Sequence, residues 1–142
     1  MLRPDDLTRV TWSCVHFAAA DEVTPQLRAA LETAGMASFD LNGESMRTKE
    51  DLLRAIAEAM RFPDHFGMNW DAMIDCLRDL ADRVPAEGHV LFVHAAERFW
   101  RTGLPWAGQF LEVWLAAAEE AAHDGIPLHL VFVNTASPSP AA

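Results

Sequence analysis

Four aspartates recur at helical spacing near the middle of the chain, in the segment DHFGMNWDAMIDCLRDLAD at residues 64–82. They are Asp71, Asp75, Asp79 and Asp82. A helix from residue 70 to about residue 82 would place them within an arc of roughly 80°, although like charges at this spacing repel one another. Carboxylates so arranged could bind a metal ion, act as an acid and base pair, or form an anionic surface for a cationic partner.

A charged, solvated helix face is the commonest explanation for such a pattern, and Arg78 beside Asp75 offsets part of the repulsion. Two details favour a binding surface instead. Aspartate is a mediocre helix former. The helix dipole favours a negative charge only in the first turn, and Asp75 and Asp79 lie beyond that turn. Short carboxylates on a rigid element suit a preorganised anionic surface.

A catalytic or metal site is not expected, although Asp64, His65, Asp71 and Asp75 could be imagined as ligands or as an acid and base pair. The chain has no HExxH, GxSxG or phosphate-binding glycine motif. Its two cysteines lie far apart and lack the spacing of zinc ligands. We therefore expect no enzymatic activity, no cofactor and no metal, and keep a carboxylate-dependent hydrolase only as a third alternative.

The charge of the chain indicates the kind of partner. With 21 acidic and 11 basic residues among 142, the net charge of −10 opposes nucleic-acid binding and favours a basic protein. The apolar run at residues 10–20 is short and is broken by Ser13 and His16, unlike a secretory signal. No segment is long enough to span a membrane. These features and the unpaired cysteines predict a cytoplasmic protein.

Strands and helices alternate along the chain, which predicts an α/β fold with a layer of mostly parallel strands. Thr24, Thr48 and Asn69 are expected N-caps, Gly67 is expected to supply a backbone turn, and Trp106 is expected to be exposed. Strands are predicted at 9–18, 38–41, 89–95 and 127–133, and helices at 24–35, from 48 to about 60, from 70 to about 82, from 96 to a stop at Gly103, and at 105–125.

The run LNGESMRTKEDLLRAIAEAMRFPDHFGMNWDAMIDCLRDL, residues 41–80, resembles the barstar family, intracellular inhibitors of the ribonuclease barnase. The resemblance combines four features at unbroken spacing. They are the turn NGE, the segment FPDHFG, the pattern Gly67-x-Asn69-x-Asp71-Ala72, and Asp75-Cys76-Leu77. The resemblance implies a barstar-like domain at residues 38–134. Residues 1–37 are then an N-terminal βα extension joined to the same sheet, and residues 135–142 a disordered tail.

In that family an acidic helix and the preceding loop plug the active site of a ribonuclease, so the resemblance implies an inhibitor of immunity or antitoxin type. The implied partner-binding residues are Asp75, Asp71, His65, Ile74, Arg78, Asn69, Gly67 and Glu120, with Glu119 as the alternative to Glu120. The chain departs from the family at His65, Ile74, Arg78 and Leu80, where the family has tyrosine, tryptophan, threonine and tryptophan. The alternative function is a protein-interaction or regulatory module that inhibits no nuclease.

Overall fold

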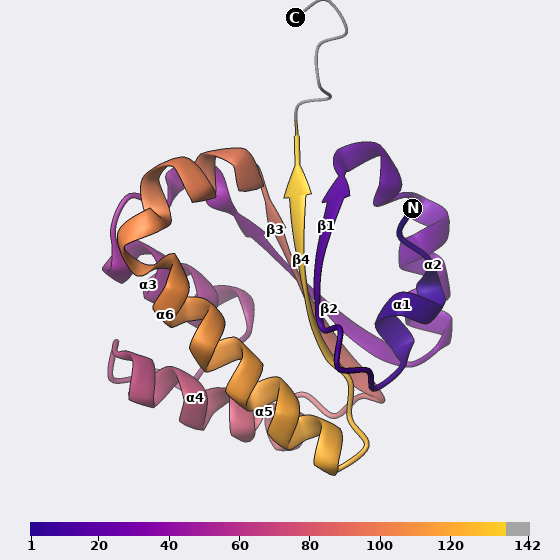
Figure 1. Ribbon diagram of the computed structural model, residues 1–142. Coiled ribbons are helices and arrows are strands. Elements are labelled where there is room, and N and C mark those ends of the chain that lie inside the picture. The colour runs from indigo at the N-terminus through magenta and orange to yellow at the C-terminus, as the bar shows by residue number, and fades with distance from the viewer. Residues whose placement is uncertain (136–142) are drawn as a thin grey trace, which may run out of the picture.

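A four-stranded, fully parallel sheet forms the centre of the computed structural model, which describes residues 1–135 (Figure 1). Its order is β1-β4-β3-β2. The strands are β1 (Val15–Ala19), β2 (Met36–Asn42), β3 (Gly88–His94) and β4 (Leu128–Asn134). The sheet confirms the predicted α/β fold. Of the tail expected at residues 135–142, all but Thr135 lies outside the described residues.

Helices cover both faces of this sheet. One face carries α1 (Pro4–Thr8) and α2 (Pro25–Thr33), and the other carries α3 (Lys49–Ala59), α4 (Trp70–Arg78), α5 (Leu80–Arg83) and α6 (Ala96–His123) (Figure 1). Two short 3-10 turns, η1 (Ala20–Glu22) and η2 (Gly43–Ser45), follow β1 and β2. The acidic segment therefore lies on the larger helical layer.

Two hydrophobic cores follow from the alternation of side chains along the central strands. On β3, Val90 and Phe92 pack with Leu7 and Leu31 beneath α1 and α2. The intervening residues of β3 and β4 pack with the larger helical layer. Both central strands are buried on both faces, which explains their almost wholly apolar sequences.

Side-chain caps define where the helices begin. Thr24 Oγ1 accepts a hydrogen bond from Leu27 N at 3.0 Å, and Thr48 forms a reciprocal capping box with Asp51. These two caps are confirmed. Past α2 the backbone turns at Gly35, whose φ of 80° is accessible to glycine at little cost. Local sequence thus set these boundaries.

The N-terminal strand is shorter than the sequence predicts. Residues 9–14 connect α1, which was not predicted, to β1, and Trp12 in this connection is 97% exposed. The strand begins only where Val15 pairs with Leu130 of β4. An alternating pattern forms a strand only where a neighbouring edge can pair with it, and here the pairing partner lies 115 positions away in the sequence.

The prediction of a helix stop at Gly103 is wrong, because α6 continues without interruption through Pro105. Gly103 is buried, and a Cβ atom there would lie 2.8 Å from the Trp106 ring. Trp106 is only 7% exposed, contrary to expectation, and its ring lies 5.3 Å from that of Phe99. Packing of this ring over the glycine overrides the local tendency of glycine and proline to end the helix.

Candidate functional site

The acidic segment forms two helices where the sequence predicts one. The first, α4, ends at Arg78, and Asp79 adopts φ −89° and ψ 2° before α5 begins at Leu80. The amide of Asp79 bonds to the carbonyls of Asp75 and Leu77, while the Leu80 side chain is buried at 2% exposure. The prediction that all four aspartates share one helix face is therefore wrong for Asp82, which belongs to α5.

A surface hollow of about 580 Å³ nevertheless collects most of these charges. It lies between the loop that precedes α4 and the outer faces of α4 and α5. Its lining includes His65, Gly67, Asp75, Asp79 and Asp82. Asp71 is exposed in the first turn of α4 but does not line the hollow. Folding therefore brings two other predicted contact residues, His65 and Gly67, together with Asp75 at one anionic hollow.

Asn69 positions α4 relative to this loop. Its Oδ1 atom accepts a hydrogen bond from Ala72 N at 2.7 Å, and its Nδ2 atom donates to the Gly67 carbonyl at 3.2 Å. The predicted cap is confirmed. The left-handed backbone in this loop occurs at Met68, with φ of 54°, and not at Gly67 as expected. A Cβ on Gly67 would lie 3.3 Å from Asn69 Nδ2, so the small residue gives the cap room.

The inner side of α4 is fixed on α6. Met73 and Leu77 are buried in the larger core, and Trp70 Nε1 donates a hydrogen bond to Gln109 Oε1 at 3.1 Å. Lys49 Nζ lies 5.9 Å from the centre of the Trp70 ring. Ile74 is half-buried against the same core. The outer carboxylates therefore stand on a rigid element.

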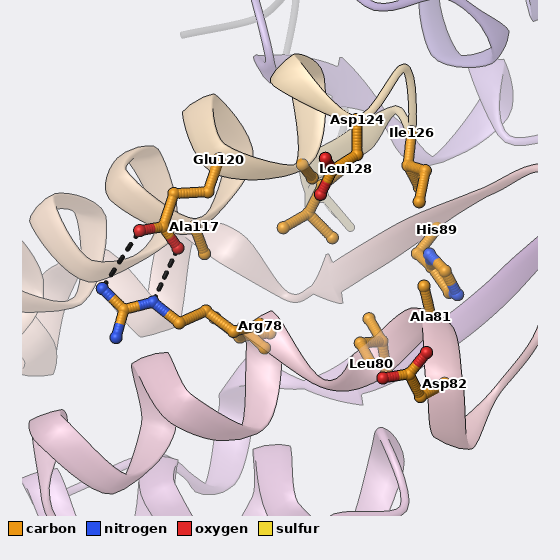
Figure 2. Close-up of a pocket in the computed structure, with 12 residues that line it drawn as sticks. Arg78, Leu80, Ala81, Asp82, His89, Ala117, Glu120, Asp124, Ile126 and Leu128 are labelled. Atoms are coloured by element: carbon orange, nitrogen blue, oxygen red, sulfur yellow. Dashed lines mark hydrogen bonds and ion pairs between the residues drawn. The ribbon is translucent and has the colours of Figure 1, made fainter.

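Arg78 interacts with two of the carboxylates expected to bind a partner. Its Nε atom lies 2.6 Å from Glu120 Oε2 and its Nη2 atom 3.1 Å from Glu120 Oε1 (Figure 2). Its Nη1 atom lies 3.3 Å from Asp75 Oδ1. Solvent reaches this ion pair, since both side chains remain about half exposed. The ion pair raises the pKa of Arg78 and lowers the pKa of Glu120.

The two alternatives for the acidic residue on α6 lie in different places. Glu120 faces α4 through Arg78, whereas Glu119 lines a separate hollow beside Val10 and Trp12. The geometry therefore brings Glu120, and not Glu119, toward the acidic segment.

Arg83 is a residue of this site that the sequence did not single out. Its guanidinium donates to the carbonyls of Arg61, at 2.7 Å, and Cys76, and it stacks over the Phe62 ring at 5.3 Å. It thereby ties α5 to the end of α3 and to α4 at the edge of the hollow. No sequence signal could have revealed these contacts, because two of them involve backbone atoms of distant residues.

The site offers little for catalysis. Burial raises the pKa of the Cys76 thiol, which opposes a role as a nucleophile. Within residues 1–135 no three histidine, cysteine, aspartate or glutamate side chains are grouped so that they could hold a metal ion. None of the helices in this part of the chain is both long and apolar enough to cross a membrane.

Comparison with known proteins identifies the family of this fold. A family model described as barstar (barnase inhibitor) matches residues 36–133, from the first residue of β2 into β4. No curated protein matches the chain. The matched family is one of inhibitors and not of enzymes, which confirms that the chain is not an enzyme. Since the match covers more than half of the sequence and includes the whole acidic segment, the chain belongs to the barstar family.

Proposed function

We propose that this protein binds and inhibits a basic ribonuclease through α4 and the loop before it. The observation that carries the proposal is the placement of Asp75. Its side chain is 70% exposed on the outer face of α4 and lines the anionic hollow, while the opposite face of the helix is buried. A carboxylate held in this way can enter the cationic pocket in which a ribonuclease binds the phosphates of RNA.

The rigid mounting of Asp75 favours binding by a preorganised surface. Because α4 is capped by Asn69 and anchored by Met73 and Leu77, little conformational freedom is lost when a partner docks. His65 and Gly67 on the preceding loop border the same hollow, so one partner could contact the loop and the helix together. Asp71, one turn before Asp75, adds a second exposed carboxylate.

The charge of the whole chain supports the same partner class. A net charge of −10 attracts a basic protein over several ångströms and increases the rate of encounter. Both cysteines are free, as expected for a protein that works in the reducing cytoplasm, which is where we place the inhibitor.

A second function is favoured by one observation, the ion pair between Arg78 and Glu120. This pair neutralises part of the surface that would face the ribonuclease, as would suit a protein-interaction or regulatory module that kept the fold and has a different partner. Such a module would form a complex without affecting RNA cleavage.

The decisive experiment is affinity capture from an extract of the cell that makes the protein, with Asp75→Ala as the matched bait. The proposal expects a basic protein that the parent retains, that Asp75→Ala retains poorly, and that elutes as salt rises. The eluted protein is then assayed for RNA cleavage with and without added inhibitor. Loss of cleavage supports inhibition, and a complex that leaves cleavage unchanged supports the interaction module. Equal capture of the same proteins by both baits would contradict binding through Asp75.

A further inference from the structure

Arg78 spans a groove of about 430 Å³ between α4–α5 and α6, and its side chain extends toward Glu120 (Figure 2). Two of its nitrogen atoms donate to the two oxygens of that carboxylate, at 2.6 and 3.1 Å. This is the paired geometry in which a guanidinium binds a carboxylate most strongly. The third nitrogen lies 3.3 Å from Asp75. The Arg78 side chain therefore pairs with two carboxylates of the acidic surface, Glu120 and Asp75.

This arrangement changes what a partner would meet at Glu120. Both oxygens of Glu120 already accept hydrogen bonds from Arg78. A cation brought by a partner would have to displace Arg78, exchanging one ion pair for another, or lie close to its positive charge. Asp75 differs, because only its Oδ1 atom contacts Arg78, at the longer distance of 3.3 Å, and its side chain is more exposed.

Resting on the proposed function, we infer that Arg78 is a specificity-determining residue of the inhibitor. It occupies the position at Glu120 that a partner's cation would otherwise take. The surface then selects ribonucleases that present a neutral or acidic side chain at that position, and it disfavours those that present an arginine or lysine there. The anionic contact with the partner is concentrated on Asp75 and the hollow beside it.

Arg78 is not needed to hold the two helices together. Buried Met73 and Leu77 and the hydrogen bond from Trp70 to Gln109 already join α4 to the larger core and to α6. An ion pair between half-exposed side chains contributes little to stability, because water screens both charges. Removal of Arg78 should therefore leave the fold intact and alter the surface.

Barnase serves as the probe, because it is the ribonuclease that the family description names. Its affinity is measured for the parent protein, for Arg78→Ala and for Arg98→Ala. Arg98 is a matched control, since it also pairs with a glutamate, Glu44, at 3.1 Å. Arg98 is twenty residues from Arg78 in the sequence. It lies at the opposite end of α6 from Glu120, and the distance between Arg98 and Glu120 along the helix is roughly 33 Å at a rise of about 1.5 Å per residue. Both substitutions change the net charge equally.

Arg78→Ala is expected to bind barnase at least about tenfold more tightly than the parent, and Arg98→Ala less than about threefold more tightly. Glu120→Gln should abolish the gain when combined with Arg78→Ala, and should change the affinity of the parent little. This pattern would show that Arg78 masks Glu120.

Three results would overturn the inference. They are equal binding of barnase by the parent and Arg78→Ala, no binding by either, and a gain that survives Glu120→Gln. The proposed function is tested separately: it fails if the affinity capture retains the same proteins with the parent and with Asp75→Ala. Melting temperatures of all variants, measured alongside, identify any change that comes from loss of the fold.

Discussion

His16 on β1 lies directly against His129 on β4, with Nε2 of His16 2.9 Å from Nδ1 of His129. The Nε2 atom of His129 lies 2.8 Å from the Arg9 carbonyl oxygen, which can only accept a hydrogen bond. His129 therefore carries its proton on Nε2, and His16 donates to the bare Nδ1. Two neutral imidazoles thus join the N-terminal segment to the sheet.

Acid should weaken this junction. Burial, followed by the nearby His129, lowers the pKa of His16 to about 4, although Asp6 opposes the shift, and burial likewise lowers the pKa of His129. In the unfolded chain both histidines take up protons near pH 6.5, so the folded state loses stability as the pH falls from there toward 4. For His16 the loss is at most about 3 kcal/mol, from 1.36 kcal/mol per pKa unit.

The variant His16→Gln tests this dependence, because its amide can still donate to His129 but does not titrate. We expect its free energy of unfolding, measured with denaturant, to change less between pH 7 and pH 4.5 than that of the parent. His123→Gln, at an exposed histidine, is the control. Identical pH dependence in the parent and His16→Gln would contradict the assignment.

Asp40 links α2 to the sheet at the edge opposite β1. Its Oδ1 atom lies 2.7 Å from His94 Nε2 and 2.8 Å from Arg28 Nη2. These partners, His94 before Arg28, lower the pKa of Asp40 to about 2 against partial burial. A carboxyl whose folded pKa is depressed stabilises the protein above its unfolded pKa, so this contribution is present at neutral pH and disappears as the pH falls from about 4 to 2.

Asp40→Asn should therefore destabilise the protein by about 1 kcal/mol at pH 7, a value reduced because solvent screens a side chain that is nearly half exposed. The difference between variant and parent should shrink as the pH approaches 2. Chemical denaturation at several pH values measures both quantities. A difference that stays constant down to pH 2 would show that the charge of Asp40 is not the cause.

Asp75→Ala should weaken binding to the captured ribonuclease by about 2 to 5 kcal/mol, because it leaves a buried cation of the partner without its counter-ion. Its melting temperature should match that of the parent, since the side chain is mostly exposed. Glu32→Ala removes an equal charge from α2, on the opposite face of the sheet, and should change the affinity little. Equal affinities for the two variants would remove Asp75 as the main contact.

Binding to the same ribonuclease should depend on salt mainly through the association rate. The net charge of −10 attracts a basic partner over long distances. Dissolved ions screen this attraction, with a Debye length of about 8 Å at physiological ionic strength. Stopped-flow measurement at rising salt should show the association rate falling steeply and the dissociation rate changing little. An association rate that does not change with salt would exclude electrostatic steering.

Removal of residues 1–35 should destabilise the remaining chain. The deletion takes away β1, which pairs with β4, and Leu7, Leu27 and Leu31, which cover the face of the sheet formed by Val90 and Val131. Exposure of that apolar face should lower the melting temperature and promote aggregation. A truncated chain that melts at the parent's temperature would show that residues 1–35 are an independent attachment.

The sequence by itself determined the features that depend on neighbouring residues. The caps at Thr24, Thr48 and Asn69 each bind an amide three positions away, so their residue types and spacing were sufficient to predict them. The almost wholly apolar sequences of β3 and β4 are likewise a local feature, and they are typical of strands that are buried on both faces. The family resemblance also came from sequence, through motifs at fixed spacing.

Tertiary structure decided the features that depend on distant residues. Packing of Trp106 on Phe99 kept α6 continuous across Gly103 and Pro105, and pairing with β4 limited β1 to residues 15–19. The pairing of Arg78 with Glu120 spans 42 positions. Local sequence showed Arg78 only as a neighbour of Asp75. The approach of α6 to α4 makes it a ligand of Glu120, because a side-chain ion pair requires two helices to be positioned within a few ångströms of each other.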